Sequence, residues 1–314
     1  MDPFAGGGDL LQWARRNHCS STIAYDIEPK CADCIQRDSL MDPPDYQGAV
    51  LVTNPPYLAA NKCRTGDKRP FEKWQASDYY KCHLASLNEC DEAIEIVPSN
   101  FLCESRSAAR ERLFCTHHVV SAKIWDRPVF DDTNSGICVL HIKRGARPEQ
   151  RFLATLFPKN ETFEMVLKPE YGYLHGEEFF EHINVDPIRI IKTDIGMDPP
   201  NTKIVVGLLD HGAWPVGLSI NDGEPLFSRE KSFTTYQVTL PDHDIDYNSQ
   251  RAVVAAFQEK MRYYREMYSD MFLANYMGPK QKILSRSYVH KMMTRCMMDA
   301  GLIADAKAPE LFEW

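Results

Sequence analysis

The tetrapeptide Asn54-Pro55-Pro56-Tyr57 is the part of this sequence best suited to chemistry, and it follows the apolar run 49–52. The side-chain carbonyl of Asn54 and the main-chain carbonyl of Pro55 can both accept hydrogen bonds from one planar amino group. Because Pro55 and Pro56 fix φ and lack N–H donors, the turn is stiff and its carbonyls keep their direction. Tyr57 can stack on the ring that carries the amino group. The turn therefore predicts a site for a planar amine, although a plain Pro-Pro turn at a strand end is the alternative.

A glycine-rich segment lies at the start of the chain, where residues 2–9 read Asp-Pro-Phe-Ala-Gly-Gly-Gly-Asp. A helical pattern follows at 10–14, so Gly6 and Gly8 are expected at the mouth of a helix. Glycine lets the backbone approach a ligand closely, and the first turn of a helix offers N–H groups. Many α/β proteins use such a turn simply to pack a helix on a strand, so this segment does not by itself predict a ligand.

Two acidic residues at predicted strand ends extend this pattern. Asp26 ends the strand predicted at 22–26, about twenty residues after the glycines, and a carboxylate there suits the two hydroxyls of a ribose. Asp38 closes a further strand at 35–39 and can accept a hydrogen bond from an adenine amino group. Each acid singly is explained as well by a helix N-cap or an exposed loop charge. Together, in this order, they predict a site for a nucleoside-containing cofactor.

This order of motifs resembles that of the class I S-adenosylmethionine-dependent amino-methyltransferases, and most of all the N6-adenine DNA methyltransferases of restriction–modification systems. The cofactor motif precedes the catalytic motif and a long variable region follows both, as in the γ group of that family. The resemblance covers roughly the first half of the chain and implies S-adenosylmethionine as the cofactor. It further implies that the turn with Asp2, Gly6 and Gly8 faces the methionine moiety, Asp26 the ribose and Asp38 the adenine ring.

The resemblance also implies the catalytic step. Asn54 and Pro55 would hold the exocyclic amine of adenine, whose nitrogen attacks the sulfonium methyl directly, without a covalent enzyme intermediate. The amine cannot be reached inside a duplex, so the base is flipped out and held by stacking between Tyr57 and Phe130. Phe130 belongs to the segment 127–142, which is similar to the family's closing hairpin. A plain hairpin core residue is the alternative for Phe130.

The chain departs from the family at its first strand. The family has a strand and a further segment before the glycine-rich turn, whereas Met1 stands directly before Asp2 here. We therefore expect a Rossmann-like sheet whose first strand is missing or truncated, through a lost N-terminus, a misassigned start or a strand supplied by another chain. Because both edges and both faces of a central strand are normally buried, we do not expect full activity of the chain as written.

Other functions stay open at this point. Asn-Pro-Pro-Tyr also serves enzymes that methylate a glutamine amide in release factors or guanine amines in ribosomal RNA. Without its first strand, the chain can also be a non-catalytic remnant, or one piece of a split enzyme that binds DNA without methylating it. The long C-terminal region and its basic helix favour DNA as the substrate.

Double-stranded DNA is the predicted partner, with a cognate restriction endonuclease as a candidate second partner. The net charge of −8 argues against indiscriminate binding to nucleic acid, so local basic clusters must make the contacts. The first cluster follows the catalytic turn and contains Lys62, Arg64, Lys68 and Arg69. The second lies on a predicted helix and contains Arg286, Lys291 and Arg295. The apolar stripe of that helix is expected to be buried and comprises Val289, Met292, Met293, Cys296 and Met297. Solvated surface charge is the alternative for both clusters.

The composition is that of an ordinary globular protein, with 44% hydrophobic and 25% charged residues among 314. No apolar run approaches the roughly 20 residues of a transmembrane helix and no secretory signal is present, so we expect a cytoplasmic protein without a membrane partner. One Cys-x-x-Cys pair, Cys31 and Cys34, lacks the second pair that a zinc site would need. We expect reduced thiols and no metal.

Short β-rich runs alternate with helical patterns up to residue 148, for example a helix at 78–89 and a strand at 94–98. This alternation predicts an α/β domain with a largely parallel sheet covered on both faces. We expect the S-adenosylmethionine-binding catalytic domain at 1–148. Residues 149–314 are expected to form a variable α+β target-recognition region with C-terminal helices.

Overall fold

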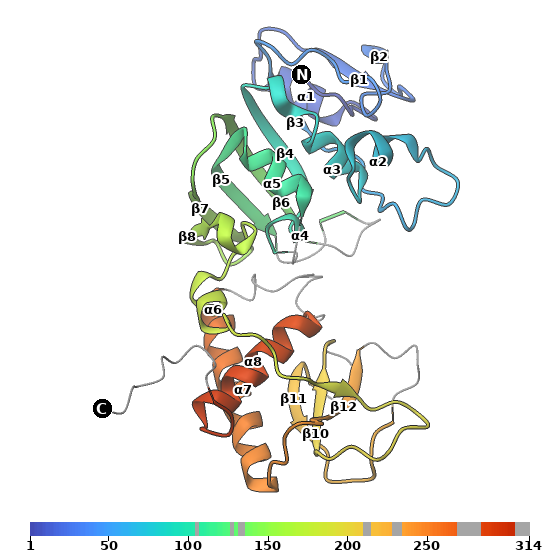
Figure 1. Cartoon of the computed structure of the whole chain (residues 1–314). Coiled ribbons are helices and arrows are strands. Elements are labelled where there is room, and N and C mark those ends of the chain that lie inside the picture. The colour runs from blue at the N-terminus through green and yellow to red at the C-terminus, as the bar shows by residue number, and fades with distance from the viewer. Residues whose placement is uncertain are drawn as a thin grey trace. The chain divides into compact units, whose positions relative to one another are not determined.

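A computed structural model of the whole chain places two compact units, Met1–Leu174 and His175–Trp314 (Figure 1). The described residues are 1–103, 107–125, 129–130, 136–209, 215–227, 234–268 and 284–304. None of the described helices combines the length and the apolar composition that a bilayer-spanning segment needs.

A six-stranded mixed sheet forms the centre of the first unit, with the strand order β3-β4-β6-β5-β7-β8. The strands are β3 (Val50–Thr53), β4 (Glu92–Pro98), β5 (His117–Trp125), β6 (Ile137–Arg144), β7 (Gln150–Phe157) and β8 (Glu161–Leu167). β3 runs parallel to β4 and β5 runs parallel to β7, whereas β6 is antiparallel to both of its neighbours. The predicted α/β class is confirmed, but the sheet is mixed because β5 and β6 follow each other as an antiparallel pair.

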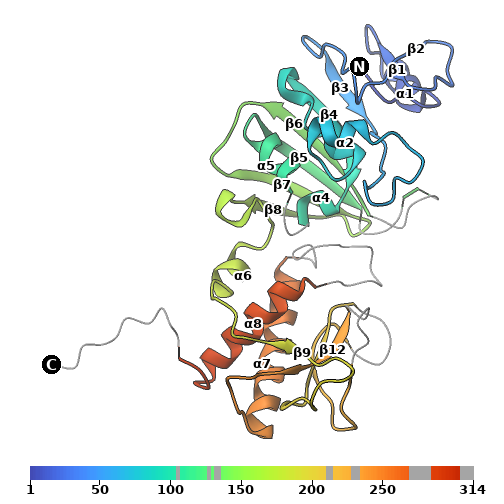
Figure 2. The same cartoon turned by 45° about the vertical axis from the view of Figure 1, so that its right-hand side comes forward.

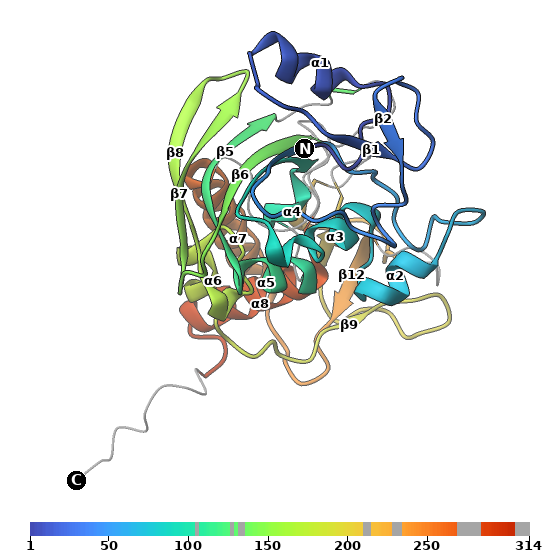
Figure 3. The same ribbon diagram turned by 90° about the horizontal axis from the view of Figure 1, so that it is seen from above.

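The helices of this unit are α1 (Asp9–Arg16), α2 (Arg69–Trp74), α3 (Tyr79–Leu84), α4 (Asn100–Cys103), α5 (Ala108–Phe114) and the 3-10 helices η1 (Leu87–Glu89) and η2 (Pro169–Tyr171). One face of the six-stranded sheet carries α3, α4 and α5, and the other carries α1 (Figure 3). The predicted helices on both faces are therefore present, although one face has far less helix than the other.

Burial along β4 shows the same difference between the two faces. Ala93, Glu95 and Val97 are buried, whereas Ile94 and Ile96 are half-buried. Successive side chains of a strand point to opposite faces, and both isoleucines line a cavity together with side chains of α1. The face toward α1 is thus the incompletely covered one.

A smaller parallel pair, β1 (Ala24–Asp26) and β2 (Cys34–Gln36), belongs to the same unit. Met1 and Asp2 lie between β1 and β3. The Asp2 amide donates to the Ile23 carbonyl at 2.9 Å, and the Val52 amide donates to the Met1 carbonyl at 3.0 Å. These two residues therefore occupy strand positions that join both sheets, and they represent the first strand that the sequence led us to expect as missing or truncated.

The first unit extends beyond the expected domain boundary at residue 148. β7 pairs with β5 and β8 pairs with β7, so both strands that follow this position belong to the six-stranded sheet. That pairing buries Phe152, Ala154 and Leu156 in the core of the unit. The segment around residue 148 connects β6 to β7, which belong to the same sheet and lie on either side of β5, and the unit ends at Leu174.

The second unit contains a four-stranded antiparallel sheet and three described helices. Its strand order is β11-β10-β12-β9. The elements are β9 (Ile191–Lys192), β10 (Ile204–Gly207), β11 (Gly217–Ile220), β12 (Thr235–Thr239), α6 (Glu177–His182), α7 (Tyr247–Met267) and α8 (Arg286–Asp299). Figure 2 shows α7 and α8 beside this sheet. The predicted apolar stripe of α8 is confirmed, because the following residues are all buried: Val289, Met292, Met293, Cys296 and Met297.

Candidate active site

The Asn-Pro-Pro-Tyr turn begins where β3 ends, at the carboxyl edge of the parallel strands β3 and β4, which is where α/β sheets bind ligands. Tyr57 is anchored to the neighbouring strand, because its hydroxyl oxygen lies 2.7 Å from the Ile96 carbonyl oxygen and 2.5 Å from Asn54 Oδ1. Pro55 is buried and Pro56 is exposed. The position of Asn54 is therefore set by two strands as well as by the stiff proline turn.

Asp2 connects the glycine-rich turn to this corner. Its Oδ1 accepts hydrogen bonds from the Thr53 hydroxyl at 2.7 Å and from the Phe4 amide at 3.0 Å. The side chain is buried, and this burial raises the pKa of its carboxyl group. Because Thr53 directly precedes Asn54, the carboxylate of Asp2 serves inside the chain as a link between the two motifs.

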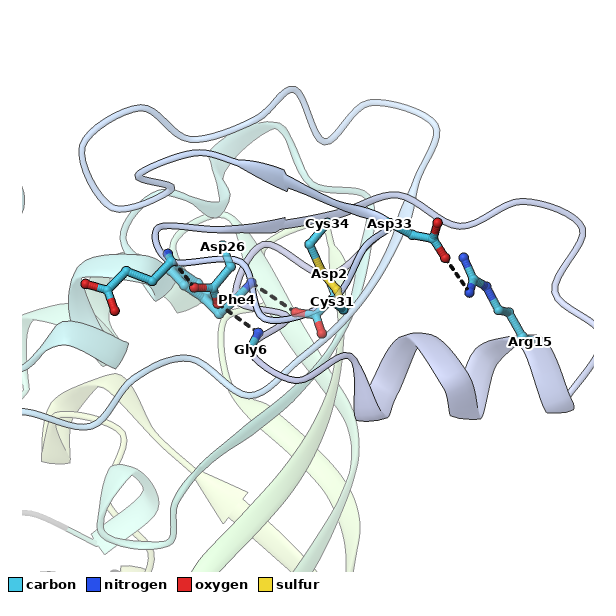
Figure 4. The surroundings of a disulfide bond; sticks show 9 residues. Asp2, Phe4, Gly6, Arg15, Asp26, Cys31, Asp33 and Cys34 are labelled. Atoms are coloured by element: carbon cyan, nitrogen blue, oxygen red, sulfur yellow. Dashed lines mark hydrogen bonds and ion pairs between the residues drawn. A yellow bond between two sulfur atoms is a disulfide. The ribbon is translucent and has the colours of Figure 1, made fainter.

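Gly6 and Gly8 give the turn its shape. Both have positive φ, 50° and 85°, which favours glycine. A Cβ at Gly8 would also lie 3.2 Å from the Cβ of Cys31. The Gly6 amide donates to Asp26 Oδ2 at 2.8 Å (Figure 4), so the turn is hydrogen-bonded to the end of β1.

The two predicted acids are both held by backbone amides. Asp26 Oδ1 accepts from the Glu28 amide at 2.8 Å, in addition to the bond between Oδ2 and Gly6. Asp38 Oδ1 accepts from the amides of Leu40 at 3.2 Å and Met41 at 3.1 Å. Both carboxylates therefore have defined orientations before any ligand binds.

One cavity of about 380 Å³ brings residues of both motifs together. Four of the site residues predicted from the sequence line it: Asp26, Asp38, Asn54 and Pro56. Its apolar lining comes from Phe4, Ile27, Leu40, Pro70 and Tyr79. A volume of this order, with a few polar groups in an apolar wall, is typical of small-molecule sites. The arrangement can hold a nucleoside-like ligand next to the amine-binding turn.

Sequence reasoning missed several of the apolar lining residues. Phe4 belongs to the glycine-rich segment, so its position in the sequence could have indicated that it lines the cofactor site. Pro70 and Tyr79 had no such signal, because their position depends on the path of the chain through α2 and α3. Tyr79 is stacked on Phe71 with ring centroids 4.7 Å apart, which fixes this side of the cavity.

Other predicted residues do not line this cavity. Gly6 and Gly8 shape the turn behind Asp26, and Tyr57 supports Asn54 from the side of β4. Phe130 is half-buried and lies between two stretches outside the described residues. Its stacking role therefore stays a prediction.

The first basic cluster is exposed, as its proposed role requires. The side chains of Lys62, Arg64 and Lys68 are exposed. Arg69 is also exposed, but its guanidinium pairs with Asp67 at 2.7 Å. The hydrogen bonds from Arg69 lower the pKa of the Asp67 carboxyl group, so this pair is ionised at neutral pH. Arg69 therefore offers less charge to a phosphate than its three neighbours do.

The second basic cluster is partly engaged within its own unit. The Arg286 guanidinium lies over the ring of Tyr236 at 5.5 Å, and Arg295 Nε lies 3.0 Å from Asp299 Oδ1. His290 is hydrogen-bonded to the Tyr236 hydroxyl at 2.9 Å, and burial lowers the pKa of its imidazole to about 4. His290 is therefore neutral at pH 7 and adds no positive charge to α8.

Cys31 and Cys34 form a disulfide directly behind the glycine-rich turn (Figure 4). The expectation of reduced thiols is wrong for this pair, because the Cys-x-x-Cys spacing brings the two Cα atoms to 5.5 Å, within the range of a disulfide. Other cysteines lie in the core of the first unit. Cys82 and Cys90 are buried, and this burial raises the pKa of each thiol to about 12.

The sequence matches no protein-family model and no curated protein. Among solved structures, the chain resembles the type IIG restriction endonuclease BpuSI, with 16% identity over 63% of this chain and 33% of that chain, at a TM-score of 0.41. It also resembles the methyltransferase subunit of a type I restriction–modification system from Streptococcus thermophilus, with 16% identity over 49% of this chain and 41% of that chain, at a TM-score of 0.35.

A third similar structure is the M protein of the type I restriction enzyme EcoKI, with 11% identity over 98% of this chain and 69% of that chain, at a TM-score of 0.36. The chain thus spans less than half the length of the first two proteins. Likeness at these values does not assign a family or an activity. The class that the strand pairing itself defines is an α/β protein with a mixed sheet, a ligand-sized cavity at its carboxyl edge and a C-terminal α+β unit.

Proposed function

We propose that this chain is the catalytic part of a DNA methyltransferase that transfers a methyl group from S-adenosylmethionine to the N6 amino group of adenine. The observation that carries the proposal is that Asp26, Asp38, Asn54 and Pro56 line one and the same cavity. The two acids belong to the cofactor pattern, and the other two residues belong to the amine-binding turn. Their shared cavity supports a site where a methyl donor and an amine meet.

The acids of the cavity fit the adenosine part of this cofactor. Each carboxylate oxygen of Asp26 accepts one hydrogen bond from a backbone amide, so each has a further lone pair for a hydroxyl of a ribose. Asp38 Oδ2 accepts no hydrogen bond among the contacts of the described residues, so it can accept one from an adenine amino group. Phe4, Ile27 and Leu40 offer apolar surface to a purine ring. When bound, S-adenosylmethionine supplies an electrophilic methyl group on a sulfonium.

Asn54 is able to present its carbonyl oxygen to the cavity. A hydroxyl carries one proton, so Tyr57 donates either to the Ile96 carbonyl or to Asn54 Oδ1. With that proton directed to Ile96, the Asn54 amide in its flipped orientation donates its NH₂ group to the Tyr57 oxygen. The Asn54 carbonyl then points away from Tyr57 and is available to a substrate amine.

The chain contributes to catalysis by positioning the substrate amine and by offering it hydrogen-bond acceptors. The amine of adenine is a poor nucleophile because its lone pair is delocalised into the ring. Acceptors at Asn54 and Pro55 favour a more tetrahedral nitrogen and stabilise its developing positive charge, so no side-chain nucleophile is required. The base must leave the duplex to reach this turn, and we assign its stacking to Tyr57 and Phe130.

The second unit is the proposed target-recognition region, and a cognate restriction endonuclease is the proposed second partner. Within α8, Lys291 is the better candidate for a phosphate contact, because Arg286 and Arg295 are engaged by Tyr236 and Asp299. This assignment rests on the general rule that phosphate contacts position a protein on DNA, whereas contacts to base edges read the sequence.

The test of the proposed function is transfer of label from the methyl group of the cofactor to duplex DNA. We expect N6-methyladenine in the hydrolysed DNA, identified by mass spectrometry. Parallel reactions contain ribosomal RNA and a glutamine-containing release factor in place of DNA. Label in RNA or protein without label in DNA would overturn the substrate, and cofactor binding without any transfer would favour a non-catalytic DNA-binding protein.

The exposed lysines after the catalytic turn are expected to contact the DNA backbone. We expect Lys62→Gln with Lys68→Gln to weaken duplex binding and to reduce the slope of log affinity against log salt by about 2, since each phosphate contact contributes roughly 0.9. Fluorescence anisotropy of a labelled duplex at several salt concentrations measures this slope. Arg69→Gln is the matched control, because Asp67 already pairs with this residue. A larger change in the control than in the double variant would contradict the assignment.

A further inference from the structure

The disulfide between Cys31 and Cys34 lies at the start of β2 and packs against the glycine-rich turn (Figure 4). A Cβ at Gly8 would lie 3.2 Å from the Cys31 Cβ and 3.4 Å from its sulfur, so the backbone at Gly8 is close to the disulfide. Both cysteines also pack against a small buried cluster, which consists of Ala5, Leu11 and Ala24. The disulfide therefore lies where the glycine-rich turn, α1 and β1 meet.

Gly6 is held from both sides by this part of the chain. Its amide donates to Asp26 Oδ2 at 2.8 Å, and its carbonyl accepts from the Lys30 amide at 3.4 Å. Because Lys30 directly precedes Cys31, the second hydrogen bond depends on the position of the disulfide. At 3.4 Å this hydrogen bond is long, so it is the weaker of the two. A shift of the residues around the disulfide would break it first.

The connection between β1 and β2 links the disulfide to the cavity. The two strands are parallel, and parallel strands are usually joined by a crossover of about a dozen residues or more. Here residues 27–33 alone join them, and Ile27 at the start of this connection lines the cavity together with Asp26. In so short a connection, a movement at Cys31 also displaces Ile27.

A reductant can reach the disulfide from solvent. Cys31 and Cys34 are half-buried, and their neighbours Lys30, Ala32 and Asp33 are exposed. Disulfides that solvent reaches exchange with thiols, whereas cysteines buried in apolar surroundings are inert. The Cys-x-x-Cys spacing is also that of redox-active pairs. These properties fit a disulfide that opens and closes in the folded chain.

We propose that Cys31 and Cys34 form a reversible redox site that controls the affinity of the cavity for its cofactor, with the disulfide as the high-affinity form. The reductant is a dithiol. One of its thiolates attacks a cysteine sulfur, and the S–S bond breaks, which forms a mixed disulfide and releases the other cysteine. The second thiolate of the reductant then closes on the first and releases the remaining cysteine. Two electrons and two protons pass from the reductant to the cysteine thiols, and the reductant becomes a disulfide.

Reduction forces the two sulfur atoms apart. Bonded sulfur atoms lie about 2 Å apart, whereas two thiols in van der Waals contact need roughly 3.5 Å or more. Cys31 cannot move toward Gly8, because the backbone is already close there. The residues around Cys31 therefore move outward, and the hydrogen bond from Lys30 to Gly6 is lost. The cofactor must then order this turn when it binds, which weakens its affinity by about tenfold.

The experiment compares two forms of the full chain, one oxidised with glutathione disulfide and one reduced with dithiothreitol without denaturant. Calorimetric titration with S-adenosylmethionine should give an affinity about tenfold weaker for the reduced form, and reoxidation should restore it. Mass spectrometry after alkylation reports the state of Cys31 and Cys34. Hydrogen exchange at the amides of Gly6 and Lys30 should be faster in the reduced form, because both amides are hydrogen-bonded in the disulfide form.

A double variant, Cys31→Ser with Cys34→Ser, reproduces the open form without a reductant. It should bind the cofactor as weakly as the reduced chain and should not respond to dithiothreitol. Cys115→Ser is the matched control, because Cys115 is an exposed free thiol directly after α5 and does not belong to this turn. This control should keep the full response to reduction. Thermal melting verifies that the variants fold, and the comparison of the two forms of the unchanged chain does not depend on them.

The effect on cofactor affinity rests on the proposed function, whereas the change in hydrogen exchange does not. A chain that binds no S-adenosylmethionine in either form would contradict the proposed function, and the exchange at Gly6 and Lys30 would then decide on the redox site. Affinities of the two forms within about twofold of each other would overturn the redox site. Unchanged exchange at both amides would overturn it too, and so would a pair that dithiothreitol does not reduce in the folded chain.

Discussion

Asn54→Ala is expected to slow methyl transfer to duplex DNA by roughly 100- to 1,000-fold, the usual cost of removing one acceptor or donor aimed at developing charge. Asn54 lines the cavity beside Pro56, and its carbonyl is one of the two acceptors for the substrate amine. The cofactor acids are separate from this side chain, so cofactor affinity should change less than about twofold. Transfer of labelled methyl groups at saturating DNA measures the rate, and calorimetric titration measures cofactor affinity.

Asn61→Ala is the matched control for this result. Asn61 is an exposed asparagine in the segment that follows the same turn, and it does not line the cavity. Its replacement should leave the transfer rate unchanged. Equal losses in the two variants, or an undiminished rate in Asn54→Ala, would remove Asn54 from the mechanism. A loss of cofactor affinity equal to the loss of rate would mean that Asn54 acts through the cofactor pocket instead.

Asp26→Ala is expected to lower the affinity for S-adenosylmethionine about 100-fold. The carboxylate holds the amides of Gly6 and Glu28 and is the proposed partner of the ribose. Hydrogen bonds to a charged group contribute about 1.5 kcal/mol or more each, and two lost bonds correspond to about 100-fold in affinity. Calorimetric titration with the cofactor measures the change, and thermal melting reports any loss of the turn itself.

Asp9→Ala is the control for the loss of an acid near the glycine-rich turn. Asp9 is exposed at the first position of α1, directly after Gly8. Its replacement removes the same charge without removing a hydrogen bond of the cavity, so cofactor affinity should change little. A similar drop in both variants would point to net charge as the cause. Unchanged affinity in Asp26→Ala would separate Asp26 from the cofactor.

The cavity residues that could be predicted are those placed by short segments. Asp26, Asp38 and Asn54 each follow a short apolar run, and residues at the carboxyl ends of neighbouring strands meet at one sheet edge. Pro70 and Tyr79 could not be predicted in this way, because they reach the cavity through the fold of a longer segment. The role of Asp2 inside the chain also depended on its partner Thr53, 51 positions away.

The fold was predictable at the level of its elements and less so in their pairing. The apolar stripe of α8 was read correctly because burial of one helix face follows from local spacing. The place of β7 beside β5 was not, since a segment such as 145–148, which contains a glycine and a proline, looks the same between two strands as between two domains. The pairing of Arg69 with Asp67 could have been predicted, because the two residues stand only two positions apart in the sequence.

The sequence by itself determined the chemistry that this chain can offer: a stiff pair of acceptors, two acids at strand ends, a glycine turn and exposed lysines. These properties depend on residue type and on neighbours within a few positions. The tertiary structure alone decided that the acids and Asn54 share one cavity and that the first unit ends at Leu174. The reason is that strand order and burial depend on contacts between segments far apart in the chain, which no local pattern specifies.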